Sequence, residues 1–462
     1  MEKKPVIAIV DIGKTNKKLL LFDQHYSIVF NSTHKLEETL DEDGDACEDL
    51  EKLSTLVLTI LKDVLALEQF DIQAINFTAY GASFVYVNDE GKTIGSLYNY
   101  LKPFPKNLQT QFYFKYGGDD QFSLKTASPV LGNLNSGMQL YRLKYTKPAL
   151  FNKIKYALHL PQFLCYLVSN QPLSEITSIG CHTNLWNFET KDYHTWVSNE
   201  NIQEKLPPIA SAETVVNAFK LKPQLKCGIG LHDTSAALIP YLLSFKEPFI
   251  LISTGTWCIS MNPFNQLPLT LEELKQDCLC YLTYQGNSVK ASRLFAGQEH
   301  EDQVKAIAKH FKVEEEFYKE VRYNTDVITK LNNIGSTAGS EANSIMESSG
   351  FMQRPMNLFS SPEEAYHRLM MDIMDQQVAS TKLVFTESKI TRIFVDGGFS
   401  KNALYMNLIS LKFPHIEVYA ASMAQATAIG AALAIHDSWN TNPIPADLIQ
   451  LKFYSSFEAQ RV

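Results

Sequence analysis

The stretch from Val6 to Phe22 reads VIAIVDIGKTNKKLLLF, and its polar centre, Asp11-Ile12-Gly13-Lys14-Thr15-Asn16, separates two apolar runs. Apolar runs on both sides of a short glycine-containing segment predict two strands joined by a tight turn. Such a turn leaves backbone N–H groups unpaired and places hydroxyls beside them, and both kinds of donor suit phosphate oxygens. The stretch therefore predicts a strand–turn–strand unit that binds phosphate.

A second segment repeats this pattern much later in the chain. Ser253-Thr254-Gly255-Thr256 follows the apolar run Phe249–Ile252 and precedes the apolar run Cys258–Met261. Two such turns in one chain predict a phosphate chain that is held from two sides.

Composition narrows the class of protein. The 462 residues exceed what one compact core usually holds, so we expect roughly two or three domains. A net charge of −8 without any lysine- or arginine-rich block argues against nucleic acid as a partner. Scattered cysteines, the lack of a signal-like N-terminus and the lack of an apolar run of about 18 residues predict a cytoplasmic protein without a membrane segment.

Each half of the chain begins with strand-like runs and continues with helical periodicity. Apolar residues recur at three- and four-residue spacing over 50–67, which predicts a helix, and we expect another helix over 148–157. A linker-like segment places the main boundary near Gly228. The expected architecture is α/β, with domains over 1–228 and 229–440 and a C-terminal tail over 441–462.

One aspartate stands at an informative place. In Gly230-Leu231-His232-Asp233-Thr234, Asp233 follows a glycine-bearing loop at an expected helix start. It can be an N-cap that satisfies unpaired N–H groups, or a general base that takes a proton from a substrate hydroxyl. Its position at the domain boundary, shortly before the second phosphate-type turn, favours the base. His232 is expected to pack or hydrogen-bond beside it.

Two further motifs are weak evidence for a ligand-binding site when each is considered alone. Asp396-Gly397-Gly398 forms a strand end with a Gly-Gly turn before an expected helix at Asn402, where a ligand could approach the backbone. The small-residue run 425–432 could pack closely against a sheet or a nucleotide.

The ordered set of these motifs resembles the FGGY carbohydrate kinases of the actin-like ATPase superfamily over residues 5–436. The strongest likeness is to ketose kinases of the L-fuculose and L-rhamnulose type, with xylulose kinases next. The resemblance implies two actin-like (ribonuclease H-like) ATPase domains facing across a cleft, and ATP-dependent phosphorylation of a sugar.

The resemblance also implies residue roles. Asp233 would be the catalytic base and Asp11 would help to hold Mg²⁺. ATP would contact the two turns and the Gly-Gly motif through Gly13, Lys14, Thr15, Asn16, Lys18, Ser253, Thr254, Gly255, Thr256, Gly397, Gly398 and Asn402. The sugar would contact Asp233 and a set of wall residues, namely Tyr80, Gly81, Asn99, Glu175 and Trp257.

Some positions depart from the family pattern. Lys14 replaces a common Thr, Ser or Ala, and Phe399 replaces a small residue, so its ring could narrow the adenine pocket or stack on the base. The segment 97–102 lacks the usual Trp and Arg, which leaves the sugar undetermined. For Asn99 and Glu175, the ordinary interpretation is that they are solvated loop residues.

Other functions remain open at this point. The chain could phosphorylate D-xylulose, a ribulose or a polyol instead, or it could be a non-catalytic actin-like ATP-binding or regulatory protein. Asp233 favours the kinase, because a pure nucleotide switch needs no base beside a sugar site. Sugar and ATP are the expected partners, and a homodimer is left open.

Overall fold

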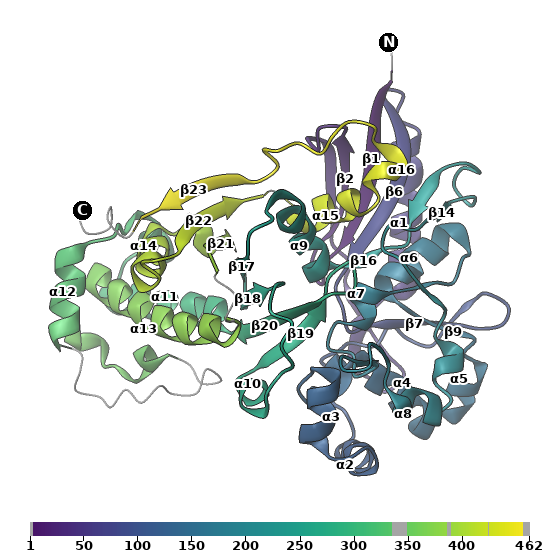
Figure 1. The fold of residues 1–462 in the computed structure, drawn as a ribbon, viewed down its shortest axis with the longest axis horizontal. Helices are drawn as coiled ribbons and strands as arrows, with labels where there is room; N and C mark the ends of the chain where they lie inside the picture. Colours follow the sequence, from purple (N-terminus) through teal and green to yellow (C-terminus); the bar gives the residue numbers. More distant parts are fainter. Residues whose placement is uncertain (1–2, 335–348, 386–389, 424, 456–462) are drawn as a thin grey trace. The chain divides into compact units, whose positions relative to one another are not determined.

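The computed structural model describes residues 3–334, 349–385, 390–423 and 425–455. Contacts divide the chain into two compact units (Figure 1). The first comprises Met1–Ser244, Cys280–Ser288 and Gln425–Leu448, and the second comprises Phe245–Leu279, Val289–Ala424 and Ile449–Val462. This division differs from the expected boundaries at Gly228 and 440, because helices on both sides of Gly228 and near the C-terminus pack onto the first sheet.

The first unit is built on a seven-stranded mixed sheet with the order β14-β15-β6-β1-β2-β3, in which β16 also pairs with β6. Its strands are β1 (Lys4–Ile12), β2 (Lys17–Asp23), β3 (Ile28–His34), β6 (Phe70–Ala79), β14 (Val215–Asn217), β15 (Lys226–Gly228) and β16 (Leu231–His232). The central strand β1 is a continuous apolar run because the sheet is covered on both faces.

Helices and smaller sheets complete this unit. The helices are α1 (Leu50–Leu65), α2 (Lys106–Lys115), α3 (Asp119–Thr126), α4 (Ser136–Thr146), α5 (Pro148–Lys153), α6 (Leu160–Ser169), α7 (Ile176–Ile179), α8 (Thr195–Asn199), α9 (Asp233–Ser244), α15 (Ala426–Ala434) and α16 (His436–Trp439). The small sheets are β4 (Glu38–Leu40) with β5 (Ala46–Glu48), β7 (Phe84–Val87) with β8 (Thr93–Ile94) and β9 (Tyr156–His159), β10 (Ser174–Glu175) with β13 (Ile209–Ala210), and β11 (Trp186–Asn187) with β12 (Asp192–Tyr193).

The expected helix over 50–67 is confirmed as α1, which begins after the N-cap Asp49. The expected helix over 148–157 is wrong beyond Lys153, because Tyr156–His159 instead pairs with β7 in antiparallel register.

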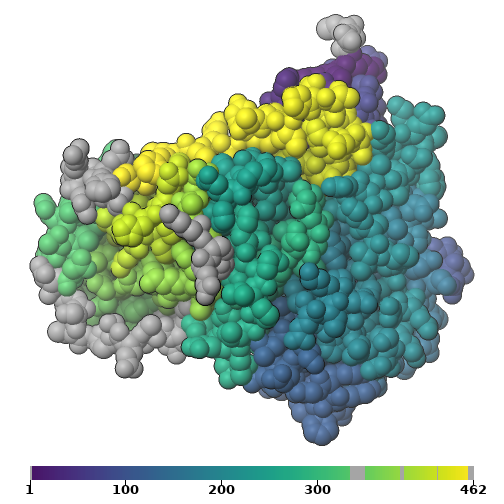
Figure 2. All heavy atoms as spheres, in the orientation of Figure 1, coloured from purple at the N-terminus to yellow at the C-terminus, as the bar shows by residue number. Residues whose placement is uncertain are grey.

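The small-residue helix α15 lies beside α9 and the first strands. A Cβ added to Gly430 would lie 1.8 Å from the Ala236 carbonyl oxygen, so only glycine permits this approach. Figure 2 shows the yellow atoms of the C-terminal segment directly against the purple atoms of the N-terminal strands. Segments about 400 residues apart in sequence therefore meet within one unit.

The second unit holds a seven-stranded sheet with the order β19-β20-β18-β17-β21-β22-β23. Its strands are β17 (Phe249–Thr254), β18 (Cys258–Asn262), β19 (Cys278–Leu282), β20 (Ser288–Leu294), β21 (Arg392–Gly397), β22 (Glu417–Ser422) and β23 (Gln450–Tyr454), and within this sheet Cys280–Leu282 of β19 and Ser288 of β20 are counted with the first unit. Its helices are α10 (Leu271–Lys275), α11 (Ala296–Phe311), α12 (Thr325–Ile334), α13 (Pro362–Leu383) and α14 (Ala403–Lys412), and α11 and α13 lie side by side (Figure 1). The mixed α/β fold agrees with the sequence prediction.

Among the residues that the structure describes, none of the helices is long and apolar enough to cross a bilayer.

Candidate active site

The first phosphate-type turn joins β1 to β2, which pair in antiparallel register. The Gly13 N–H donates to the Asn16 carbonyl at 2.9 Å, and Thr15 is exposed at the tip. The sequence therefore correctly located the turn and its exposed hydroxyl.

Two lysines next to this turn face different partners. The buried Lys17 ammonium donates to the carbonyls of Gly13 and Lys14, at 3.2 and 3.0 Å. The Lys18 ammonium donates to Oε1 of Gln425 at 2.9 Å, at the start of α15. The sequence pattern pointed to Lys18 and not to Lys17, because no local pattern marks a lysine in a strand as buried.

Asp11, at the end of β1, is a nearly buried carboxylate with 8% of its surface exposed. Its Oδ2 accepts a hydrogen bond from the Thr427 hydroxyl at 2.8 Å. Burial raises the pKa of Asp11 to about 6; the Thr427 hydrogen bond opposes this shift, the charge of Asp233 adds to it, and Lys18 opposes it. Asp11 and Asp233 therefore lie close enough to influence each other's ionisation.

Asp233 begins α9 directly after the short strand β16. Its Oδ1 accepts hydrogen bonds from the backbone N–H and the hydroxyl of Thr234, at 2.6 and 3.2 Å. Its side chain keeps 31% of its surface accessible, yet the surrounding protein desolvates the carboxylate and raises its pKa to about 6. These contacts bind Oδ1 to the adjacent residue of the helix and leave Oδ2 unengaged.

His232 is the polar neighbour of this carboxylate. Its Nε2 lies 3.2 Å from Oδ1 of Asp233 and 3.0 Å from Sγ of Cys181. The imidazole stacks on Tyr281, with ring centroids 6.0 Å apart, and burial lowers its pKa to about 3. A Cβ added to Gly81 would lie 2.8 Å from Nε2, so Gly81 lies directly against the ring.

Tyr80 and Lys14 meet at a wall beside the first turn. The Tyr80 hydroxyl donates to Oε2 of Glu48 at 2.5 Å, and its ring lies edge-on to Tyr100 at 6.2 Å. The Lys14 ammonium lies 5.9 Å from the centroids of both tyrosine rings and 2.9 Å from Oε1 of Glu38. Lys14, whose position departs from the family pattern, thus sits on an aromatic surface rather than in open solvent.

Asn99 and Glu175 occupy different surroundings. Asn99 is partly exposed and its Oδ1 accepts from the Leu101 N–H at 3.0 Å, which suits a turn residue. Glu175 is fully buried and caps α7, its Oε2 accepting from the Thr177 N–H and hydroxyl; burial raises its pKa to about 7. The solvated-loop interpretation of Glu175 is wrong, because the sequence did not reveal that β10 and α7 enclose it.

The second phosphate-type turn packs on the Gly-Gly turn within the second unit. The Thr254 hydroxyl donates to the Asp396 carbonyl at 2.6 Å, and the Gly398 N–H donates to the Thr254 carbonyl at 2.9 Å. Gly397 has a φ of +92°, and a Cβ there would lie 1.9 Å from the Thr254 oxygen. Two motifs that were weak singly are thus one structural element that requires glycine.

The remaining turn residues line the end of β17. Ser253 pairs with Ile259 across the hairpin, and the Gly255 N–H donates to the Trp257 carbonyl at 2.9 Å. The Thr256 carbonyl accepts from the Gln298 N–H at 3.2 Å, which ties the turn to the first residues of α11.

Aromatic side chains flank this part of the second unit. Trp257 is exposed and its ring lies 4.6 Å from that of Phe295. Asn402 caps α14 through the Tyr405 N–H at 3.0 Å. Phe399 is buried and stacks on Tyr405 at 4.7 Å, so its ring belongs to the hydrophobic packing of the unit.

Within the described ranges, no group of three or more His, Cys, Asp and Glu side chains is arranged to hold a metal ion by itself.

Comparison with known proteins places the chain in a family. Residues 6–239 match the N-terminal domain of the FGGY family of carbohydrate kinases, and residues 246–443 match the FGGY C-terminal domain. A rhamnulokinase of Oceanobacillus iheyensis is 21% identical over 267 residues, which cover 54% of each chain. One of Halalkalibacterium halodurans is 23% identical over 269 residues, again 54% of each. The chain thus spans about half the length of the curated relatives it matches.

Solved structures share the fold over nearly the whole chain. A carbohydrate kinase from Novosphingobium aromaticivorans has a TM-score of 0.80 at 19% identity, covering 100% of this chain and 96% of that chain. A xylulose kinase from Lactobacillus acidophilus has a TM-score of 0.76 at 14% identity, covering 99% and 96%. At these identities the likeness shows the fold alone. With both domain matches in sequence order, the resemblance read from the motifs is confirmed, and the chain belongs to the FGGY family of carbohydrate kinases.

Proposed function

We propose that this protein is an ATP-dependent kinase that transfers the γ-phosphoryl group of Mg·ATP to a hydroxyl of a ketose similar to L-fuculose or L-rhamnulose. The observation that carries the proposal is the pairing, in one unit, of two carboxylates whose pKa is raised to about 6, Asp11 and Asp233. One ends the strand that leads into the phosphate-type turn, and the other keeps accessible surface at a helix start. Perturbed carboxylates grouped beside an anion-binding turn are typical of catalytic sites.

Asp233 is the proposed general base. A pKa of about 6 leaves it ionised at neutral pH and still basic enough to take a proton from an attacking hydroxyl. His232, neutral because of its burial, lies 3.2 Å from Oδ1 without adding a charge. Oδ2, which the contacts described above leave unengaged, is then the oxygen that receives the proton.

The first turn, Gly13, Lys14, Thr15 and Asn16, is proposed to bind the phosphate chain together with Lys18. Because the Gly13 N–H already donates to the Asn16 carbonyl, Gly13 would contribute to the shape of the turn rather than a donor. The second turn, Gly397, Gly398 and Asn402 would bind ATP within the second unit, where Gly397 brings the backbone of the two turns together. Positioning and neutralisation of charge are the main sources of acceleration in phosphoryl transfer.

Asp11 suits Mg²⁺ held mainly by phosphates. Its burial raises the free energy of the bare carboxylate, as the pKa of about 6 reports, and a cation relieves that cost. One protein carboxylate combined with substrate phosphates and waters is a common magnesium environment. When bound, the ion would neutralise charge on the β- and γ-phosphates.

The proposed sugar wall comprises Tyr80, Gly81 and Asn99 of the first unit, and contact of the sugar with Trp257 of the second unit stays a prediction. Tyr80 and Gly81 have the strongest support, because Gly81 lies against His232 and Tyr80 lies beside Lys14. Glu175 has the least support as a sugar contact, because its carboxylate is fully buried and accepts from the Thr177 hydroxyl. That hydroxyl in turn accepts from the backbone N–H of His232 at 3.0 Å, so Glu175 supports the backbone before Asp233.

A screen for ADP release tests the proposal. Purified protein with Mg·ATP would be assayed with L-fuculose, L-rhamnulose, L- and D-ribulose, D-xylulose and a set of polyols. Turnover with an L-fuculose-type ketose supports the proposal, and turnover with D-xylulose, a ribulose or a polyol supports the related-kinase alternative. Nucleotide binding without turnover of any acceptor favours the non-catalytic ATP-binding alternative. The cytoplasmic location and the homodimer stay predictions.

A further inference from the structure

We infer that Lys17 and Glu48 form a positioning pair that aims the backbone donors of the first turn at the phosphate chain and links this turn to the sugar wall. The inference rests on the proposed function, since it assigns the turn to phosphate. Both side chains are almost fully buried, with 2% of the Lys17 and 5% of the Glu48 side chain exposed, and they form an ion pair through Oε1.

The Lys17 ammonium contacts three oxygen atoms. It donates hydrogen bonds to the carbonyl oxygens of Gly13 at 3.2 Å and Lys14 at 3.0 Å, and it forms the ion pair with Oε1 of Glu48. An ammonium has three N–H donors and no acceptor, so two of its donors are used by carbonyls and its charge is neutralised by the carboxylate. The lysine is therefore held in one place and cannot itself turn toward a ligand.

The trans geometry of the peptide bonds fixes the direction of the N–H groups that follow the two carbonyls bound by Lys17. In a trans peptide the carbonyl and the following N–H point in opposite directions. Because the Gly13 and Lys14 carbonyls point inward to Lys17, the N–H groups of Lys14 and Thr15 point away from it. An inward-facing cation that orders carbonyls thus presents a pair of outward-facing donors, the arrangement that binds anions in backbone nests.

Glu48 connects this turn to the proposed sugar wall. While Oε1 holds Lys17, Oε2 accepts from the Tyr80 hydroxyl at 2.5 Å. In the β4–β5 hairpin, Glu48 is also directly opposite Glu38, which pairs with Lys14 at 2.9 Å. Two glutamates that lie opposite each other in this small hairpin therefore form ion pairs with Lys14 in the turn and with Lys17 directly after it.

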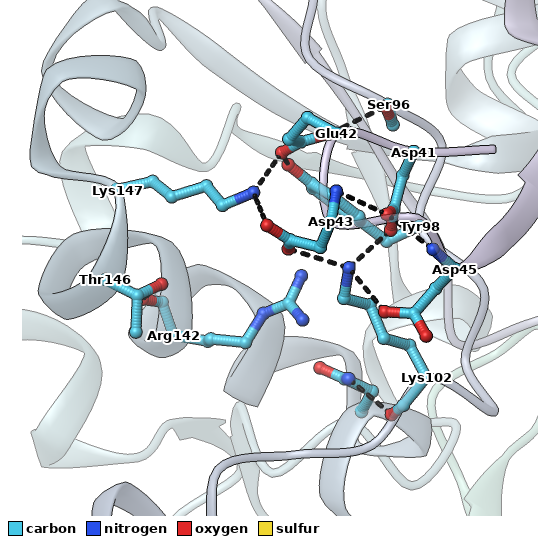
Figure 3. A network of polar contacts seen from close by, with 11 residues as sticks. Asp41, Glu42, Asp43, Asp45, Ser96, Tyr98, Lys102, Arg142, Thr146 and Lys147 are labelled. Atoms are coloured by element: carbon cyan, nitrogen blue, oxygen red, sulfur yellow. Dashed lines mark hydrogen bonds and ion pairs between the residues drawn. The ribbon is translucent and has the colours of Figure 1, made fainter.

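The hairpin is itself anchored, as Figure 3 shows. The Lys102 ammonium lies 2.5, 2.8 and 2.9 Å from carboxylate oxygens of Asp41, Asp43 and Asp45, the residues that connect β4 to β5. Lys147 at the end of α4 contacts Glu42 and Asp43 from the other side, at 2.5 and 2.8 Å.

The same anchor reaches the segment that carries Asn99. Ser96 donates to Oε2 of Glu42 at 3.0 Å, the Tyr98 hydroxyl bonds to the other oxygen, and Glu48 forms a backbone bridge with Leu97. The acidic residues are thus bound internally by lysines and hydroxyls, and the hairpin forms a rigid support for the Glu48 carboxylate. A shift of Glu48 would move the phosphate donors and Tyr80 together.

Calorimetric titration with AMP-PNP and Mg²⁺, compared with adenosine, tests the inference without any sugar. Lys17→Met and Glu48→Gln should weaken AMP-PNP binding about tenfold, as expected when the turn loses one hydrogen bond to phosphate. Adenosine binding should stay within about twofold of wild type. Tyr80→Phe, which removes only the donor to Glu48, should weaken AMP-PNP binding about threefold. The matched control is Glu200→Gln, since Glu200 is a buried carboxylate of the same unit held by Lys115 and Lys144.

The possible results separate the claims. AMP-PNP affinity of Glu48→Gln within about twofold of wild type overturns the positioning role, even if Lys17→Met does not fold, because the amide keeps the size of the carboxylate. Equal losses for AMP-PNP and adenosine, or a loss in Glu200→Gln as large as in Glu48→Gln, overturn it as well. Wild-type protein that binds no AMP-PNP contradicts the proposed function instead.

Discussion

The imidazole Nε2 of His232 lies 3.2 Å from Oδ1 of Asp233, and burial keeps that imidazole neutral, with a pKa of about 3. Its other nitrogen, Nδ1, has no hydrogen-bond partner among the residues described, and Nε2 also lies 3.0 Å from Sγ of Cys181. Asp233 therefore has a neutral polar ring as its neighbour, which Nε2 shares between the carboxylate and the thiol. A cation in that place would have lowered its pKa, whereas burial raises it to about 6.

The first prediction concerns pH. Because the base must be ionised and its pKa lies near 6, kcat/KM should be constant above about pH 7 and fall well below pH 6, by tenfold per pH unit for one essential carboxylate and by up to a hundredfold for two. Asp11 titrates in the same pH range, and its ionisation is coupled electrostatically to that of Asp233. The acidic side of the pH profile therefore reflects the protonation of both carboxylates. The profile should be measured with a saturating nucleotide and limiting sugar. Constant activity down to pH 5 would contradict the assignment.

The influence of His232 on Asp233 can be tested by two substitutions of different chemistry. His232→Leu replaces the polar ring 3.2 Å from the ionised carboxylate by an apolar side chain, so the acid limb of the pH profile should move up by about one pH unit. His232→Gln can place an amide donor near the position of Nε2 and should keep the wild-type limb. If both variants show the same apparent pKa on the acidic side of the kcat/KM profile, His232 only fills space against Gly81 and Tyr281.

Asp11 should limit the stability of the folded protein. Its pKa is raised from 3.8 to about 6, so the folded state binds its proton more tightly than the unfolded state does, and stability from this group falls as pH rises through that window. Asp11→Asn should therefore raise the free energy of unfolding at pH 7.5, by up to about 3 kcal/mol, while abolishing turnover. Thermal unfolding at pH 7.5 and pH 4 measures this, and the gain should vanish at the lower pH.

Gly397 and Gly398 offer a matched pair in the second unit. A Cβ on Gly397 would collide with the Thr254 carbonyl at 1.9 Å in a left-handed conformation, whereas one on Gly398 would lie 3.9 Å away. Gly397→Ala should destabilise the protein by at least about 2 kcal/mol and weaken ATP binding, and Gly398→Ala should unfold near the wild-type temperature. Equal unfolding temperatures would show that the contact between the two turns is dispensable.

Local patterns predicted the elements whose signals are local. The glycine turn after β1, the helix α1 and the mixed α/β class follow from apolar runs, glycine and spacing. Tyr156–His159 failed because its strand character comes from pairing with β7, about 70 residues earlier. The bond from Thr427 to Asp11 joins residues 416 positions apart, and no sequence window contains both.

The burial of individual charged and aromatic side chains could not be predicted from the sequence either. Lys17 and Glu48 each look like ordinary surface charges in sequence, and only the tertiary fold reveals that they neutralise each other inside the unit. Phe399, whose ring could narrow an adenine pocket, is buried and stacks on Tyr405, a contact that its sequence neighbourhood did not indicate. Long-range pairing decides such placements, because a charged or aromatic residue fits either environment until its partner is known.

The central claim is that Asp233 is the base of a sugar kinase, and Asp233→Asn tests it most directly. The amide keeps the shape and the Thr234 contacts but cannot accept the proton, so the rate of sugar-dependent ADP release should fall by about 10²–10⁴-fold. AMP-PNP affinity should remain within about twofold of wild type, which shows that the variant is folded. Turnover of Asp233→Asn at a rate near that of wild type, with the same sugar, would contradict the account.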